Sequence, residues 1–290
     1  MQVASSAKKV VRACVPRSIR NWVRAPRASA RWSLEEVRFF FGGRKTIELR
    51  PGWQLLCHPA AYRTAYRAQA EDPEQVAEFD AFISHSAPAM TLFDVGAHFG
   101  LFSLAALHYG GTSSRAVAVD PSPVAARFVK LQAKLNGVSS RLQVVQASAG
   151  DSDGWRDMIS VGVQASGYYI APSKEHPRSE LTKTRAITLD ELAREFRVRP
   201  THIKIDVEGD EASVLRGGSS VLSTEPAPLL FVELHNEIVR QSGRDPAETL
   251  ALLRDYGYQT FTVENAPIDE AAILSQPLVR IIARKLLRES

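Results

Sequence analysis

The chain has 290 residues, of which 44% are hydrophobic, and 36 Lys and Arg residues stand against 32 Asp and Glu. That length and apolar content suffice for a packed core, so disorder throughout the chain is excluded. Residues 1–34 carry eight basic residues and no acidic one, which leaves a net −4 for the remaining 256. Because the basic charge is confined to one end, specific binding of nucleic acid by the whole protein is disfavoured.

The basic N-terminal arm, residues 1–34, has three open roles. Pro16 and Pro26 interrupt any long helix, which favours a solvated arm. Its Arg-rich, acid-free composition also resembles an organellar transit peptide. Apolar residues between the arginines would suit peripheral contact with an anionic membrane. No apolar run approaches the roughly 20 residues of a membrane-spanning helix, so we expect a cytoplasmic protein, with membrane contact and organellar targeting both left open.

Residues 35–90 indicate an N-terminal α+β region. Lys45–Leu49 and Trp53–Cys57 are predicted as two short strands around a Pro-Gly turn. Pro73–Ser84 follows as a helix, because apolar residues recur on one side and proline is favoured in a first helical turn.

Beyond residue 90, apolar strands alternate with helices. We predict strands over Thr91–Val95, Ala116–Val119, Leu142–Gln146, His202–Val207, Leu229–Leu234 and Gln259–Val263. The predicted helices are Leu101–Tyr109, Val124–Asn136, Thr188–Phe196, Ala212–Leu222 and Pro246–Tyr256. Such alternation indicates an α/β fold, a mostly parallel Rossmann-like sheet with helices on both faces.

Two segments depart from this alternation. Leu278–Lys285 is rich in Ile and Val, which favours a closing edge strand, antiparallel to the rest, over a basic helix. Residues 151–186 are interrupted by Gly, Ser and Pro and indicate an insertion. Its place after the third strand would let it cover the site and select the substrate.

The first predicted strand ends in the sequence DVGAHFG, residues 94–100. Gly96 and Gly100 allow a tight turn and a close approach of a ligand, but the spacing is not the GxGxxG of dinucleotide binding. Asp120 ends the second strand, where an acidic residue can accept hydrogen bonds from both hydroxyls of a ribose. Together these features favour a nucleoside-type cofactor, although a tight turn and a surface Asp would explain each one separately.

Four candidate catalytic residues follow the next two strands of the sheet. Asp206 and Glu208 would point to the same side if the fourth strand continued through them. Glu233 and His235 end the fifth strand with the same spacing. Because parallel strands present their carboxyl ends at one edge, we expect the four to converge there. An ion pair between Lys204 and Asp206 is the structural alternative.

The ordered motifs DVGAHFG, VDPSP, KLNG, ITLDEL, IKIDVEGDEASVLRGG and FVELH resemble the FkbM family of S-adenosylmethionine-dependent methyltransferases over about residues 90–265. The resemblance is most specific in LDEL, KIDVEGDE and LRGG. It makes residues 91–290 the methyltransferase domain and implies the class I methyltransferase fold. Family members usually have Asn at the position of His98, and often Glu at that of Asp120.

The resemblance also implies site residues. Asp94, Gly96, His98 and Gly100 would belong to the loop that holds the methionine part of the cofactor. Asp120 would bind the ribose, and Ser148 would lie beside the adenine. The resemblance places Asp206 and Glu208 near the transferred methyl group.

The predicted function is S-adenosylmethionine-dependent O-methylation of a small-molecule or glycan hydroxyl, on a sugar or a secondary metabolite. Asp206, Glu233 or His235 would take the hydroxyl proton. A divalent cation held by Asp206, Glu208 and Glu233 is a second route, and we favour the metal-free one. The alternatives are a nicotinamide-dinucleotide oxidoreductase and a non-catalytic cofactor-binding module.

Overall fold

The computed structural model describes residues 37, 39–160, 168–169 and 180–285. The predicted basic arm, residues 1–34, and part of the predicted insertion lie outside these residues. Within the described ranges, no helix combines the length and the apolar character needed to cross a membrane.

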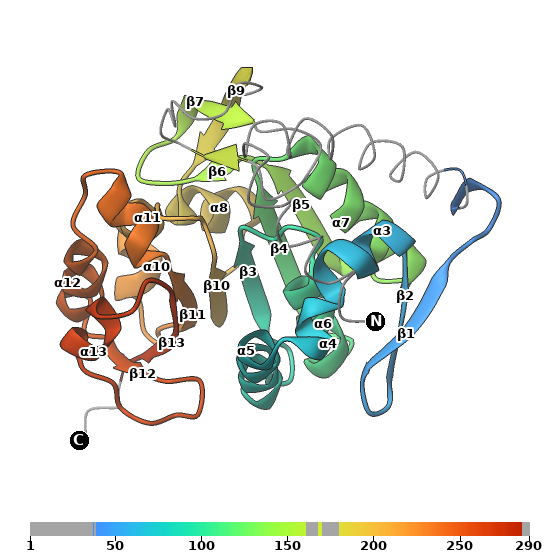
Figure 1. Ribbon diagram of the computed structural model, residues 1–290, viewed down its shortest axis with the longest axis horizontal. Coiled ribbons are helices and arrows are strands. Elements are labelled where there is room, and N and C mark those ends of the chain that lie inside the picture. The colour runs from blue at the N-terminus through green and yellow to red at the C-terminus, as the bar shows by residue number, and fades with distance from the viewer. Residues whose placement is uncertain (1–36, 38, 161–167, 170–179, 286–290) are drawn as a thin grey trace, which may run out of the picture.

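The centre of the fold is a seven-stranded sheet of order β12-β13-β11-β10-β3-β4-β5 (Figure 1). Its strands are β3 (Thr91–Val95), β4 (Arg115–Asp120), β5 (Leu142–Gln146), β10 (His202–Ile205), β11 (Leu229–Leu234), β12 (Gln259–Phe261) and β13 (Val279–Arg284). All neighbouring pairs are parallel except those that β13 makes with β11 and β12. The predicted mostly parallel sheet with an antiparallel last strand is confirmed. The chain passes from β3 to β4 on one side and later returns to β10 on the other, which puts the topological switch point between β3 and β10.

Helices cover both faces of the sheet, because alternate residues of each strand face two separate cores. Leu92 belongs to the core with α5, α6 and α7, whereas Phe93 belongs to the core with α8, α9, α10 and α12. The helices that follow β3 are α6 (Leu101–Tyr109), α7 (Pro123–Leu135), α8 (Leu189–Phe196), α9 (Glu211–Arg216), α10 (Ser219–Ser223), α11 (Asn236–Gln241), α12 (Ala247–Asp255) and α13 (Glu270–Leu274), with a short 3₁₀ helix η2 (Ser139–Arg141).

The N-terminal α+β region packs on the first of these cores. It contains the antiparallel pair β1 (Lys45–Arg50) and β2 (Trp53–Cys57), followed by α3 (Pro59–Ala61), the π-helix η1 (Tyr62–Tyr66), α4 (Ala68–Glu71) and α5 (Pro73–Ser84). The two predicted strands and the predicted helix are therefore confirmed. Asp72 caps α5 by accepting hydrogen bonds from the backbone N–H groups of Glu74 and Gln75. Asn136, at the end of α7, holds β2 by bonding both backbone groups of Leu56.

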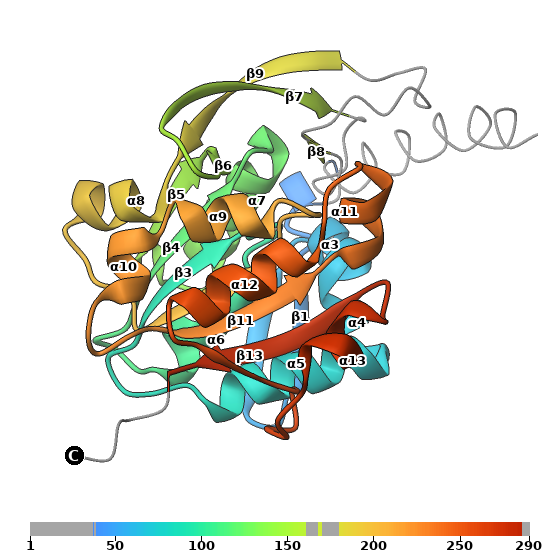
Figure 2. The ribbon, with the colours of Figure 1, turned by 90° about the vertical axis from the view of Figure 1, so that its left-hand side faces the viewer.

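The predicted insertion forms a second sheet of order β6-β9-β7-β8 above the carboxyl edge of the central one (Figure 2). Its strands are β6 (Ser148–Ala149), β7 (Gly154–Ser160), β8 (Tyr168–Tyr169) and β9 (Glu180–Ile187). β9 leads into α8, whose cap is Thr188: its hydroxyl accepts the backbone N–H of Glu191 at 3.0 Å.

Three sequence predictions need correction at the carboxyl edge. The fourth strand ends at Ile205 rather than at Val207, because Glu208 and Gly209 adopt left-handed backbone angles, with φ of 54° and 96°. The predicted strand geometry for Asp206 and Glu208 is therefore wrong. The helix predicted over 212–222 is two helices that meet at Gly217, where an added Cβ would lie 1.9 Å from the carbonyl oxygen of Gly150.

The third correction concerns the last strand. β13 is a strand, as predicted, but it lies between β11 and β12 and not at the edge. Helix α11 was not predicted, because its six residues, NEIVRQ, are too short and too polar to show helical periodicity.

Candidate functional site

A cavity of about 260 Å³ opens at the carboxyl ends of β3, β10 and β11, beside the switch point. All four predicted catalytic residues line it: Asp206, Glu208, Glu233 and His235. Of the predicted cofactor-binding residues, Asp94, Gly96 and His98 line the cavity, whereas Gly100, Asp120 and Ser148 do not. The N-terminal region closes one side with residues that include Gln69, Gln75 and Glu78.

The glycine-rich loop touches the loop that carries the acidic residues. Gly96 has a φ of 80°, and a Cβ placed there would lie 1.7 Å from the backbone carbonyl oxygen of Asp206. Gly100 begins α6 with a φ of 75°, and a Cβ there would lie 3.1 Å from the side chain of Val129. Packing alone thus requires glycine at position 96, whatever ligand the loop holds.

Two buried carboxylates, Asp94 of β3 and Asp120 of β4, are held by hydrogen-bond donors. Asp94 accepts the backbone N–H and the hydroxyl of Ser103 at 3.0 and 2.6 Å, and burial raises the pKa of this carboxyl to about 6. Asp120 accepts the backbone N–H groups of Ser122 and His98 at 2.8 and 2.9 Å, and burial raises the pKa of Asp120 to about 7. These contacts fix both side chains before any ligand binds.

His98 lines the cavity and has one ring nitrogen without a hydrogen-bond partner among the described residues. Its backbone is left-handed, with a φ of 51°, and its ring stacks on Phe99 with centroids 4.3 Å apart. Burial lowers the pKa of His98 to about 4, so the ring is neutral at physiological pH. Its Nε2 atom is buried and has no hydrogen-bond partner among the described residues. A bound ligand would satisfy this atom.

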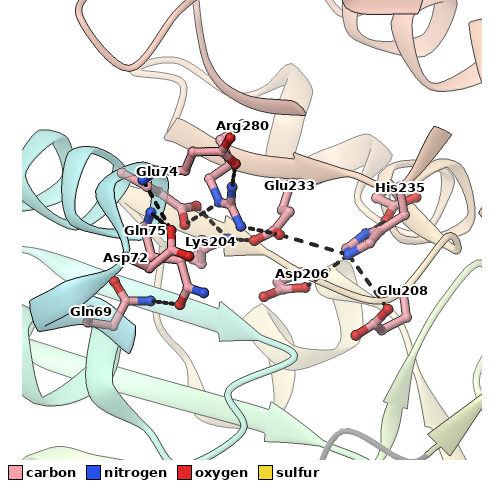
Figure 3. A network of polar contacts seen from close by, with 12 residues as sticks. Gln69, Asp72, Glu74, Gln75, Lys204, Asp206, Glu208, Glu233, His235 and Arg280 are labelled. Atoms are coloured by element: carbon pink, nitrogen blue, oxygen red, sulfur yellow. Dashed lines mark hydrogen bonds and ion pairs between the residues drawn. The ribbon is translucent and has the colours of Figure 1, made fainter. Parts of the chain in front are cut away.

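The cavity cluster consists of Asp206, Glu208 and His235 (Figure 3). The Nε2 atom of His235 lies 3.8 Å from Oδ1 of Asp206 and 3.7 Å from Oε2 of Glu208. On the other side of the ring, Nδ1 lies 2.8 Å from Oε1 of the buried Glu211. Burial disfavours protonation of His235, but the hydrogen bond to Glu211 and the nearby carboxylates outweigh it and raise the pKa of His235 to about 9.

The buried charge network consists of Glu78, Lys204, Glu233 and Arg280. Figure 3 shows Lys204, Glu233 and Arg280 beside the cavity cluster. The Nζ atom of Lys204 is 2.8 Å from Oε1 of Glu78 and 3.8 Å from Oε2 of Glu233. Arg280 donates to Oε1 of Glu233 at 2.8 Å and lies 3.2 Å from Oε2 of Glu78. The structural alternative that paired Lys204 with Asp206 is therefore wrong.

Sequence reasoning missed two members of this network. Glu78 lies inside the apolar stripe of α5, beside Phe79, and Arg280 lies within an Ile- and Val-rich strand. The available signal was a charged residue directly between two apolar neighbours, because a charge in a buried apolar segment needs a partner.

The inserted sheet is tied to the acidic loop by another ion pair. Arg156 of β7 donates to Oδ2 of Asp210 at 3.0 Å, and Arg244 donates to Oδ1 of the same residue at 3.2 Å. Asp210 follows Glu208 by two residues. The insertion and the segment after α11 therefore both fix the loop that carries Asp206 and Glu208.

Comparison with known proteins identifies the family. The methyltransferase FkbM domain matches residues 94–260, more than half of the chain. The chain belongs to the FkbM family of methyltransferases. This match to the family model confirms the resemblance found in the motifs. A separate search of curated proteins finds no match.

Solved structures similar to this FkbM-family chain have low sequence identity to it. The methyltransferase FkbM from Methylobacillus flagellatus KT is 14% identical with a TM-score of 0.43, and the alignment covers 77% of this chain and 57% of that one. The ribosomal protein L11 methylase from Lactobacillus delbrueckii subsp. bulgaricus is 11% identical with a TM-score of 0.47, with coverages of 83% and 99%. An O-methyltransferase from Bacillus cereus, solved in complex with SAH, is 10% identical with a TM-score of 0.42, with coverages of 77% and 84%.

The FkbM-family cavity fits the family's cofactor in its donor and acceptor groups. S-adenosylmethionine carries a sulfonium and an ammonium, and the cavity lining contains more carboxylates than cations. His98, whose Nε2 has no hydrogen-bond partner among the described residues, and Asp94 both line this space. A cationic, hydrogen-bonding ligand therefore suits the residues present.

Proposed function

We propose that this FkbM-family protein catalyses S-adenosylmethionine-dependent O-methylation of a hydroxyl group on a sugar or another metabolite. One observation carries the proposal: Asp206 and Glu208 lie at the cavity, about a third exposed, with no Lys or Arg of the described chain paired to them. Two carboxylates next to a glycine-rich loop would provide the proton acceptor that a hydroxyl needs when it attacks a methyl group.

The chain's own residues would bind and orient the reactants. Asp94, Gly96 and His98 would hold the methionine part of the cofactor, and Asp120 the ribose. Bound S-adenosylmethionine would supply an electrophilic methyl group to the acceptor hydroxyl oxygen, with the sulfonium sulfur as the leaving group. The cavity residues contribute mainly alignment, because such an in-line displacement depends on it.

One carboxylate of the pair Asp206 and Glu208 would take the proton that leaves the acceptor hydroxyl. Glu233 is held by Arg280 and Lys204, so we assign it a positioning role in place of a catalytic one. His235 is held by Glu211 through Nδ1 and faces the two carboxylates through Nε2.

A hydroxylated acceptor is supported by the N-terminal wall of the cavity. The side-chain amide nitrogen of Gln69 donates to Oε1 of Gln75 at 3.0 Å, so the Oε1 atom of Gln69 points away from Gln75. That oxygen is buried and has no hydrogen-bond partner among the described residues. A buried acceptor without a donor costs free energy, and a hydroxyl of the acceptor molecule would satisfy it.

The cofactor half of the proposal is tested by calorimetric titration of the full chain with S-adenosylmethionine. We expect saturable binding by the wild-type protein and its loss in Asp120→Ala. Absence of binding to well-folded wild-type protein would overturn the proposal. A thermal shift with a nicotinamide dinucleotide, and none with S-adenosylmethionine, would favour the oxidoreductase.

The chemical half is tested by mass spectrometry of candidate hydroxylated acceptors incubated with protein and cofactor, reading the gain of one methyl group. Glu208→Gln should keep cofactor binding and lower the transfer rate about 10²–10⁴-fold, the contribution typical of a proton acceptor. Glu237→Gln, an exposed change on α11, is the matched control. Retained cofactor binding without transfer to any hydroxyl would favour the non-catalytic module.

A further inference from the structure

The cavity cluster has the composition of a metal site. Asp206, Glu208 and His235 each offer one ligand atom, and these atoms lie within 4.8 Å of one another. Two carboxylate oxygens and one imidazole nitrogen form a mixed donor set that suits first-row divalent cations such as Mn²⁺ or Zn²⁺. All three residues follow neighbouring parallel strands, so the framework of the sheet fixes their separation.

His235 points to a missing cation independently of the acids. Its side chain is only 9% exposed, and its Nε2 makes no hydrogen bond within the described chain, although it is aimed between Asp206 and Glu208 (Figure 3). Nδ1 is taken by Glu211 at 2.8 Å, which fixes the ring. Metal-bound histidines typically donate their second N–H to a carboxylate in this way. Nε2, whose nearest acidic oxygens lie 3.7–4.0 Å away, is therefore the ring atom that a cation would bind.

Of the acidic residues around the cavity cluster, Glu233 is paired with Lys and Arg side chains in the described part of the protein, whereas Asp206 and Glu208 are not. Glu233, the fourth acidic neighbour, is neutralised by Arg280 at 2.8 Å and by Lys204. No Lys or Arg of the described ranges pairs with Asp206 or Glu208. A divalent cation would offset the repulsion between the two carboxylates, which have only His235 as a nearby partner within the described chain.

The backbone holds the cluster open. Glu208 adopts a left-handed conformation, which is costly for a residue other than glycine and persists only where the surroundings enforce it. The next residue, Gly209, donates its N–H to Oε1 of Glu211 at 2.9 Å. One buried carboxylate, Glu211, therefore fixes both the strained loop and the ring of His235.

We propose that Asp206, Glu208 and His235 form a binding site for a first-row divalent cation, with Glu211 as the positioning residue of His235. This differs from the ligand set suggested by the sequence, in which Glu233 took the place of His235, and from the metal-free route favoured there. Each carboxylate offers the cation one oxygen, so its second oxygen stays available to take a proton. Three protein ligands leave positions for water or for acceptor oxygens, where a cation lowers the pKa of a hydroxyl. That use in catalysis rests on the proposed methyl transfer; the binding itself does not.

The test is titration of the full chain, freed of metal with a chelator, with Mn²⁺ alone, followed by electron paramagnetic resonance of the free ion and by calorimetry. We expect one saturable site per chain. Glu208→Gln should weaken Mn²⁺ binding at least tenfold, as should His235→Gln, and Glu211→Gln should weaken it about 10–100-fold. Glu237→Gln should bind as the wild type does, because this exposed acid lies outside the cavity.

Two outcomes would overturn the metal site: no saturable Mn²⁺ binding by wild-type protein, or equal binding by Glu208→Gln and Glu237→Gln. Circular dichroism checks the fold of each variant, and Glu208 is exposed enough for its change to leave folding intact if Glu211→Gln does not fold.

Calorimetry with S-adenosylmethionine separates the two proposals. Cofactor binding without Mn²⁺ binding overturns the metal site only, and Mn²⁺ binding without cofactor binding overturns the proposed function only.

Discussion

The buried charge network and the cavity cluster lie side by side at one edge of the sheet, yet their charges are balanced differently. In the network every carboxylate has a cation within 4.0 Å, and Lys204 and Glu78 are 2% and 3% exposed. In the cluster the two carboxylates share one cationic partner among the described residues, His235, whose Nε2 lies 3.8 and 3.7 Å from them, and both are about a third exposed at the cavity. Removing charges from water is costly unless they are paired, so the network serves the fold and the cluster retains charge for a ligand.

The largest expected effect comes from breaking the network. Lys204→Met leaves Glu78 and Glu233 with Arg280 as their shared cation, and removal of one partner from a buried ion pair typically costs about 3–5 kcal/mol. We expect a loss of that size in the free energy of unfolding, measured by urea denaturation. The double variant Lys204→Met with Glu78→Gln should recover much of it. A loss below about 1 kcal/mol for the single change would show that the network does not stabilise the fold.

A smaller effect should come from Asp120, a carboxylate held by N–H donors and not by a cation. Its raised pKa of about 7 means that the ionised form, which on our proposal would accept hydrogen bonds from a ribose, is lost as the pH falls through 7. Affinity for S-adenosylmethionine should therefore fall about tenfold between pH 8 and pH 6. In Asp120→Asn the same titration should be flat; an equal pH dependence in that variant would assign the effect to another group.

The raised pKa of Asp120 gives the free energy of unfolding the opposite pH dependence to that of cofactor affinity. Because the pKa of folded Asp120 lies above its unfolded value, this group stabilises the protein fully at low pH. That contribution is lost as the pH rises toward 7, so ionisation of Asp120 at pH 8, which should favour the cofactor, lowers the stability of the cofactor-free protein. Denaturation at pH 5 and pH 8, with and without cofactor, measures both effects.

The smallest effect should follow from neutralising the cluster. Asp206→Asn or Glu208→Gln should change the free energy of unfolding by no more than about 1 kcal/mol, toward greater stability, because burial and the neighbouring carboxylates raise the pKa of Glu208. The measurement is the same urea denaturation used for Lys204→Met. A loss comparable to that of Lys204→Met would remove the distinction between the two regions.

The sequence sufficed where local rules act alone. Pro73–Ser84 and Leu101–Tyr109 were predicted to the residue, because a capping Asp, a first-turn Pro and an αL glycine define their starts. The rim residues were predicted to converge because parallel strands share a carboxyl edge, and the structure places all four at the cavity. Their catalytic and cofactor-binding roles stay predictions.

Tertiary contacts decided the rest. β10 ends before the left-handed residues Glu208 and Gly209, in a loop that packs closely on Gly96, and the break before α10 lies where Gly217 packs on Gly150. Partners as distant as Glu78 and Lys204 cannot be paired from local periodicity, because the helix and the strand that carry them meet only in the fold. For the same reason the place of β13 inside the sheet was not predictable.

That placement of β13 affects how the protein is assembled during synthesis. β12 leaves the ribosome before β13, yet it has no neighbour in the sheet until β13 fills the space beside β11. Arg280 arrives with this strand, so Glu78 and Glu233 must share Lys204 until then. Domains generally fold as units as the chain emerges. Here the last strand both closes the sheet and supplies a charge to its interior, which makes completion of the fold and completion of the cavity wall a single late event.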